Sequence, residues 1–223
     1  LTYGWISDNR PVFYASMEMS PRMVMRSMLE IHSQKNYKEE SRNNPSQWKQ
    51  EISRASVEFS DAPLYLWERL AYNSDDELVV AIRHARRTYG CRIIIIDNLH
   101  YFVDKKASSE ASDIERIMTR LNTLAQQIDA MILLVVHPNH TIKPTESVRL
   151  NSLKGSSSIP QWAHNIWVVY RGEEDKEGRI DVIKSRDDGW CGEVGVMYNP
   201  KTSTYRDVGA GVKIRKIRQR ELL

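Results

Sequence analysis

Acid and base side chains follow three apolar stretches of this 223-residue chain, and their types suit phosphoryl-transfer chemistry. Glu18 comes just after residues 12–16, Asp97 ends a run of isoleucines, and His137 follows residues 130–136. Glutamate can polarise a water molecule, aspartate can hold a magnesium ion, and histidine can contact a terminal phosphate. Phosphoryl transfer depends on such positioning and charge neutralisation more than on covalent chemistry. The alternative interpretation is that the three are unrelated loop residues.

The isoleucine run at residues 93–96 predicts a strand that is buried on both faces. A half-exposed strand would alternate apolar and polar residues, whereas strands of parallel sheets covered by helices are apolar throughout. In open α/β sheets, ligands bind outside the carboxyl ends of the strands. If the sheet is parallel, Glu18, Asp97 and His137 therefore face one crevice.

Helical patterns separate the predicted strands. Ser20-Pro21 opens a helix, and residues 74–77 and 112–115 have the form of capping boxes. Residues 43–59 are helical but polar, as in a surface helix. After residue 165 the pattern changes to shorter, alternating strands, expected at residues 166–170, 179–184, 194–198 and 203–207. We therefore expect an α/β fold: a mostly parallel sheet flanked by helices, with an antiparallel C-terminal extension.

Composition and charge narrow the functional classes. The net charge is +3, but residues 212–223 hold five basic side chains and one acidic side chain, so the remainder is close to neutral. A broadly basic nucleic-acid surface is thereby excluded, and contacts with polyanions must come from loops or from the tail. Cys91 and Cys191 lack metal-ligand spacing, and no apolar run is long enough to span a bilayer. These features predict a cytoplasmic protein without membrane contact.

Six segments carry a more specific pattern. They are FYASMEMS (13–20), residues 93–99, residues 134–137, LKGSSSIPQ (153–161), VIKSR (182–186) and GVMY (195–198). In this order they resemble the RecA-like ring helicases of DNA replication, most closely the phage primase-helicase and Twinkle branch and then the DnaB-like bacterial helicases. The resemblance implies a RecA-like P-loop NTPase fold and a homo-hexamer in a bacterial or phage-infected cell. It also implies single-stranded DNA and a primase as partners.

The resemblance also implies roles for individual residues. Glu18 would activate the attacking water, Asp97 would serve Mg²⁺, and His137 would sense the phosphate of ATP or dTTP. Lys184 and Arg186 would act on the nucleotide of a neighbouring subunit, Arg186 as an arginine finger. Gln161 and Tyr198 would bind the nucleotide, with Tyr198 packing on the base. The residues assigned to DNA are Asn139, Lys143, Lys154, Gly155 and Ser156.

The sequence also departs from that family. Lys154 stands where the family has arginine, Ser157 replaces a glycine, and His164 replaces an aspartate. No G-x-x-x-x-G-K-[ST] phosphate loop occurs anywhere in the chain. We therefore expect residues 1–208 to be an amino-truncated ATPase core that lacks the phosphate-loop strand, and residues 209–223 to be a basic tail.

This truncation predicts that the chain by itself is marginally stable and hydrolyses little nucleotide, because loss of a central strand exposes two apolar strand edges. The intact protein would be a DNA-stimulated NTPase and helicase. Two alternatives remain open. One is a non-catalytic RecA-fold module that binds single-stranded DNA or acts as a loader, and the other is a different RecA-like ATPase, such as a recombinase or a circadian-clock-type ATPase.

Overall fold

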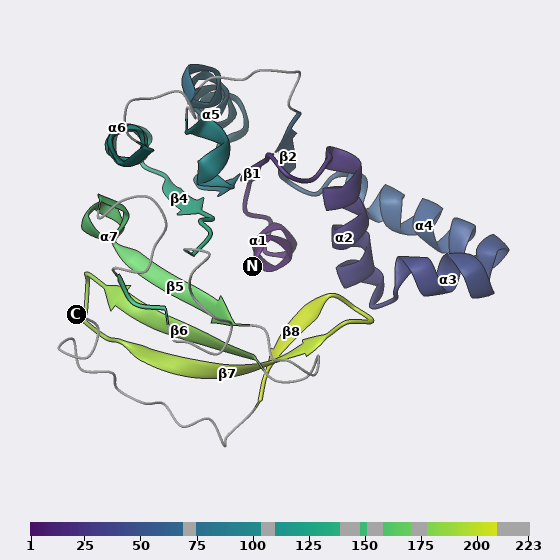
Figure 1. Ribbon diagram of the computed structural model, residues 1–223. Coiled ribbons are helices and arrows are strands. Elements are labelled where there is room, and N and C mark those ends of the chain that lie inside the picture. Colours follow the sequence, from purple (N-terminus) through teal and green to yellow (C-terminus); the bar gives the residue numbers. More distant parts are fainter. Residues whose placement is uncertain (69–74, 104–109, 139–147, 151–157, 171–177, 209–223) are drawn as a thin grey trace. The chain divides into compact units, whose positions relative to one another are not determined.

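The computed structural model describes residues 1–68, 75–103, 110–138, 148–150, 158–170 and 178–208 (Figure 1). The chain divides into two compact units. One comprises residues 1–104 and 119–136, and the other comprises residues 105–118 and 137–223. Within the described residues, each unit contains one four-stranded sheet.

The first unit is built on a parallel sheet with the strand order β2-β1-β3-β4. Its strands are β1 (Val12–Ser16), β2 (Leu64–Trp67), β3 (Ile93–Asp97) and β4 (Met131–Leu134). Its helices are α1 (Thr2–Ser7), α2 (Pro21–Ser33), α3 (Tyr37–Asn43), α4 (Pro45–Ser60), α5 (Asp75–Tyr89) and the 3₁₀ helix η1 (Leu99–Phe102). Helix α6 (Glu110–Ile128) runs across the division between the units. The predicted parallel α/β core is confirmed.

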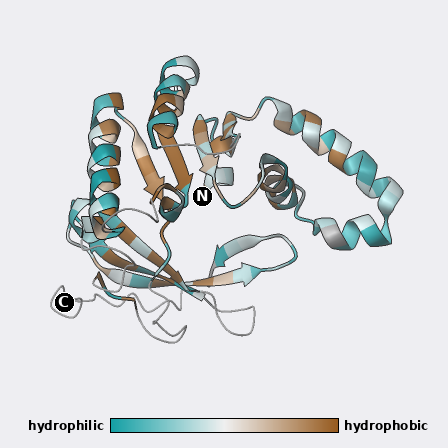
Figure 2. Ribbon diagram, turned by 45° about the horizontal axis from the view of Figure 1, so that its top comes forward, coloured by the Kyte–Doolittle hydropathy of each residue, from teal (hydrophilic) through white to brown (hydrophobic). Residues whose placement is uncertain are grey.

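The core lies on both faces of β3, as the isoleucine run predicts. Ile93 and Ile95 pack in a cluster with residues of α1, α2 and α4, and Ile94 and Ile96 are fully buried on the opposite side of the strand. In Figure 2 strands of the parallel sheet carry hydrophobic brown, whereas the helices also carry hydrophilic teal. Burial of both faces explains why this strand carries no polar residue before Asp97.

Three details differ from the sequence-based expectations. Helix α6 begins at Glu110, so Ser112 lies within its first turn and is not a cap; Glu110 and Ala111 are good helix formers and extend the helix. Helix α4 is not uniformly polar, because it buries Trp48 and Phe59. Strand β4 is shorter than residues 130–136 and only partly buried, because it is the last strand of the sheet.

The second unit contains an antiparallel sheet with the order β5-β6-β7-β8. It follows the short helix α7 (Ser158–Trp162) and consists of β5 (Asn165–Tyr170), β6 (Gly178–Ser185), β7 (Gly192–Asn199) and β8 (Thr204–Asp207). Ile166, Ile183 and Cys191 form its small apolar cluster. The predicted antiparallel extension is confirmed, strand by strand.

Candidate active site

Glu18 and Asp97 lie together at the carboxyl edge of the parallel sheet. Strand β1 pairs with β3 so that Ser16 is opposite Asp97, and the backbone N–H of Met17 donates to the Asp97 carbonyl over 2.6 Å. The chain then turns, with the Ser16 hydroxyl accepting the N–H of Met19 at 3.0 Å. Glu18 therefore projects from a tight turn directly beside the end of β3.

Asn98 joins the two strands through its side chain. Its Nδ2 donates to Oε1 of Glu18 over 2.5 Å, and its Oδ1 accepts the backbone N–H of His100 at 3.0 Å, which caps η1. The side chain is almost completely buried. Sequence reasoning missed this residue, although an asparagine just after a buried strand and before a helical turn is a recognisable capping signal.

Tyr14 provides a second contact to this edge, because its hydroxyl donates to Oδ2 of Asp97 over 3.4 Å. Burial, followed by the negative charge of Asp97 and this hydrogen bond, raises the pKa of Tyr14 well above its usual value. The phenol is therefore a proton-bearing donor at neutral pH. Tyr14 was also missed, and its sole signal is that it lies two residues before the end of β1.

The donor chemistry at Asp97 fits magnesium. Mg²⁺ takes oxygen ligands, and it is usually held by one or two carboxylates together with waters and substrate phosphates. Among the described residues there is no group of three or more His, Cys, Asp or Glu side chains that could bind a metal by itself. A site with Asp97 as the protein ligand and phosphate oxygens as further ligands agrees with both observations.

The second unit brings Lys184, Arg186 and Gln161 together around α7. The ammonium group of Lys184 donates to the carbonyl oxygens of Pro160 and Ala163, the latter at 2.7 Å. One guanidinium nitrogen of Arg186 donates to the carbonyl oxygen of Gln161 over 3.0 Å. Burial and the nearby charge of Arg186 lower the pKa of Lys184.

The other predicted residues have no contact with these two groups among the hydrogen bonds described above, or lie outside the described residues. Tyr198 is half-buried on β7 and its ring contacts Tyr205 on β8, with centroids 4.9 Å apart. His137 is exposed three residues after β4, in the second unit, whereas Glu18 and Asp97 belong to the first. The predicted DNA contacts Asn139, Lys143, Lys154, Gly155 and Ser156 all lie outside the described residues, as does the tail at 209–223.

Comparison with known proteins places this arrangement in a family. The sequence model of the family described as "DnaB-like helicase C terminal domain" matches residues 3–207. The chain is 25% identical over 154 residues to the DNA helicase/primase of Enterobacteria phage T3, covering 65% of this chain and 27% of that protein. It is 23% identical over 212 residues to the replicative DNA helicase DnaB of Mycoplasma pneumoniae, covering 87% of this chain and 45% of that protein. The chain thus spans less than half of the length of these relatives.

Solved structures show the same fold. A structure described as an ATPase domain superposes with a TM-score of 0.81 at 19% identity, covering 92% of this chain and 77% of that chain. A DnaB-like replicative helicase, described with its interactions with primase, gives a TM-score of 0.77 at 20% identity, covering 89% of this chain and 52% of that chain. The RecA-like fold class is therefore confirmed. None of the described helices is long and apolar enough to cross a membrane.

Proposed function

The chain belongs to the family of DnaB-like helicase C-terminal domains, and from this premise we propose that it is the nucleotide-hydrolysing domain of a replicative DNA helicase. The observation that carries the proposal is the juxtaposition of Glu18 and Asp97 at the carboxyl edge of the parallel sheet, with Asn98 bonded to Glu18. Ligands of open α/β sheets bind at this edge.

In this proposal Glu18 is the general base. Its carboxylate accepts the proton of the water that attacks the terminal phosphate, while the amide of Asn98 donates to one carboxylate oxygen and so orients the group. Asp97, oriented by Tyr14, would hold the magnesium ion that accompanies ATP or dTTP. When bound, that ion supplies charge neutralisation on the phosphate oxygens. Positioning, not covalent chemistry, is what these side chains contribute.

Assembly and DNA contacts belong to the same proposal. A homo-hexamer would bring Arg186 of one subunit to the nucleotide of the next, with Lys184 acting beside it, Gln161 and Tyr198 on the nucleotide and His137 as the phosphate sensor. Single-stranded DNA would contact Asn139, Lys143, Lys154, Gly155 and Ser156. A primase is a further proposed partner, which two relatives support by their descriptions, one as a helicase/primase and one as a helicase with its interactions with primase.

The test is hydrolysis by the complete gene product with Glu18→Gln. General-base catalysis contributes about 10²–10⁴ in rate, so kcat should fall by that factor while the Kd for ATP stays the same. Glu39→Gln on α3 is the matched control, because Glu39 is an exposed glutamate of the same unit, and it should leave kcat unchanged. Hydrolysis by Glu18→Gln at the wild-type rate would refute the assignment.

The same hydrolysis measurement distinguishes the helicase assignment from the alternative in which the protein only binds DNA. The sequence contains no G-x-x-x-x-G-K-[ST] motif, which is the observation that favours a non-hydrolysing module. A complete gene product that binds single-stranded DNA but shows no nucleotide turnover would establish that alternative. DNA-stimulated turnover that depends on Glu18 would establish the helicase assignment.

A further inference from the structure

The C-terminal end of α7 has an unusual set of hydrogen-bond donors. The last carbonyl groups of a helix lack partners within the helix and need other donors. Here the N–H of Ala163 donates to Ile159, Lys184 donates to Pro160 and Ala163, and Arg186 donates to Gln161 through its side chain and to His164 through its backbone. Lys184 on β6 and Arg186 just after this strand therefore provide most of the hydrogen-bond donors for this helix end.

The two cations differ in how they are used. Lys184 is half-buried and donates to two carbonyl oxygens, so its ammonium group is directed into its own chain. Arg186 is exposed, and one of its guanidinium nitrogens contacts Gln161. A guanidinium has five donor hydrogens in a fixed fork, so Arg186 keeps the capacity to bind a phosphate at the same time.

Helix α7 is also held by packing. Ser158 and Ile159 are buried, and Ala163 packs against the apolar cluster of Ile166, Ile183 and Cys191. Lys184 lies opposite Ile166 in the β5–β6 ladder, so its bonds to Pro160 and Ala163 fix the helix end against that ladder. The carbonyl groups that receive Arg186 belong to this same fixed segment.

We propose that Lys184 is a positioning residue for Arg186: it holds the carbonyl end of α7, and α7 in turn holds the arginine. This inference rests on the proposed function in assigning Arg186 to a phosphate, and it differs from a role in which Lys184 contacts that phosphate directly. Like charges side by side repel each other, and the carbonyl dipoles between them make this arrangement stable.

Kinetics of the complete gene product test the inference. Misplacing a reacting group by about 1 Å can cost about 10²-fold in rate, so Lys184→Met should lower kcat by about 10- to 100-fold and leave KM for nucleotide unchanged. Lys184→Gln keeps a neutral donor for one carbonyl and should recover part of kcat. The double variant with Arg186→Ala should be no slower than Arg186→Ala alone, because both changes act through one group. Lys201→Met, on an exposed turn, is the charge-matched control.

Hydrogen–deuterium exchange gives a readout that needs no hydrolysis. Lys184→Met should speed exchange in peptides covering residues 158–164, Lys184→Gln should have a smaller effect, and Lys201→Met should have none. Unchanged exchange in Lys184→Met overturns the inference, as does a raised KM together with equal losses in the Met and Gln variants. If the wild-type protein hydrolyses no nucleotide, the proposed function fails, and the exchange result still decides whether Lys184 holds α7.

Discussion

The side-chain amide of Asn98 makes one hydrogen bond as a donor and one as an acceptor, and this limits which residues can replace it. The Nδ2 group donates to Glu18 and the Oδ1 atom accepts from the backbone of His100, and the Asn98 side chain is almost completely buried. A buried donor or acceptor left without its partner costs about 1–3 kcal/mol. A side chain of similar size that offers only one of the two functions should therefore be tolerated poorly.

Asn98→Asp should make stability depend on pH. The change keeps the acceptor for His100 but places a carboxylate oxygen against Oε1 of Glu18, where the present separation is 2.5 Å. Two carboxylates at this distance share a proton, so the apparent pKa of the pair rises above its unfolded value. The folded state then binds more protons, and the free energy of unfolding falls as pH rises through that pKa.

Urea unfolding at pH 5 and pH 8 measures this effect. The Asp variant should lose more stability at pH 8 than at pH 5. Asn98→Leu is the matched control, because it removes both hydrogen bonds without adding a charge; its loss of about 1.5–3 kcal/mol should be similar at both values. Equal losses for the Asp variant at the two pH values would contradict the shared proton.

The residues of this site were predictable from sequence only in part. Glu18 and Asp97 each follow an apolar strand, and a parallel sheet brings such positions to one edge, so their proximity follows from pattern alone. The contacts of Asn98 and Tyr14 depend instead on the β1–β3 register and on the turn after Ser16. Register is set by packing across the sheet, which a linear pattern does not specify.

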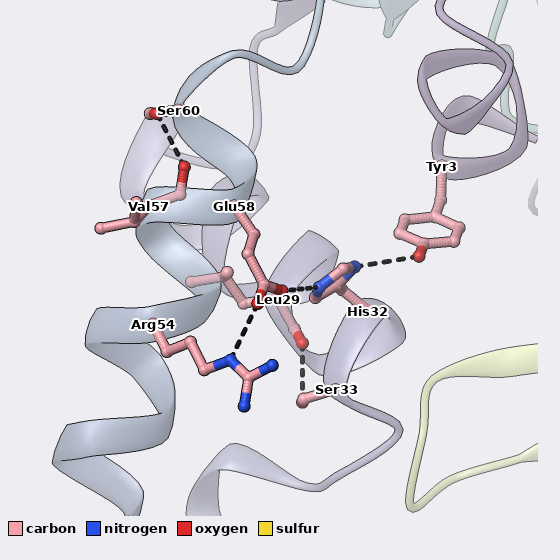
Figure 3. A network of polar contacts seen from close by, with 8 residues as sticks. All are labelled: Tyr3, Leu29, His32, Ser33, Arg54, Val57, Glu58 and Ser60. Carbon is pink, nitrogen blue, oxygen red and sulfur yellow. Dashed lines mark hydrogen bonds and ion pairs between the residues drawn. The ribbon is translucent and has the colours of Figure 1, made fainter.

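At the scale of elements, a polar network joins α1, α2 and α4 in the first unit (Figure 3). The Tyr3 hydroxyl lies 3.1 Å from Nδ1 of His32, and Nε2 of His32 lies 3.1 Å from Oε2 of Glu58. Arg54 donates to the other oxygen of Glu58 at 2.9 Å. The rings of Tyr3 and His32 also contact Phe59, so the polar network lies over an apolar cluster. The contact between Tyr3 and His32 thus fixes helix α1 to α2, and no sequence pattern predicts this contact.

Glu58→Gln should reduce the acid sensitivity of this helix packing. The hydrogen bond from His32, followed by that from Arg54, lowers the pKa of Glu58 below its ordinary value of 4.5. A carboxylate with a depressed folded-state pKa stabilises the protein above its unfolded pKa, and this contribution is lost as pH falls through the folded value. Wild-type unfolding temperatures should therefore drop more steeply below pH 4.5 than those of the variant.

Thermal unfolding followed by circular dichroism from pH 7 to pH 3 measures the difference. Near neutral pH the Gln variant should unfold at a slightly lower temperature, because the exposed ion pair contributes little. Glu39→Gln should follow the wild-type curve at every pH, since Glu39 lies on α3 outside the network. Parallel curves for Glu58→Gln and wild type would show that the network carries no acid-dependent stability.

Element boundaries show where sequence patterns stop being informative. The Ser20 cap of α2 was predicted and is confirmed, since its hydroxyl accepts the N–H of Met23. The capping box predicted at residues 112–115 is wrong, because α6 already begins two residues before Ser112. A Ser-x-x-Glu pattern marks the start of a helix only when the residues before it do not themselves favour the helix. Periodicity located α5 and α6 correctly because each buries a continuous apolar stripe.

At the scale of the whole molecule, both sheets end in strands with exposed apolar side chains. Met131 on β4 is 46% exposed, and on β5 Trp167 is 51% and Val169 58% exposed. In the described part of the chain, β4 pairs with β3 and β5 pairs with β6, so each has one unpaired edge. Exposed, apolar strand edges favour pairing with another chain. The sequence-based expectation of two apolar edges beside a lost central strand stays a prediction, because β4 pairs directly with β3 and β5 belongs to the other sheet.

Val169→Lys should suppress self-association of the 223-residue chain. Lysine on an edge strand opposes edge-to-edge pairing, because pairing would bury its charge. Val169 faces solvent on the outer strand of the antiparallel sheet, so the substitution should leave the fold intact. Light scattering over a concentration series should show growing assemblies for the wild-type chain and a smaller mass for the variant at equal concentration.

Val80→Lys distinguishes an edge effect from a general gain in solubility. Val80 is 67% exposed but lies on helix α5, where a charge blocks no strand pairing. The Val80→Lys variant also replaces an exposed valine with lysine, so the mass of its assemblies should match that of the wild-type chain. If both variants lower the mass equally, net charge explains the change and the edge of β5 does not. If only Val169→Lys does, the open edge drives association, and any segment that pairs with β5 in the complete protein should suppress it as well.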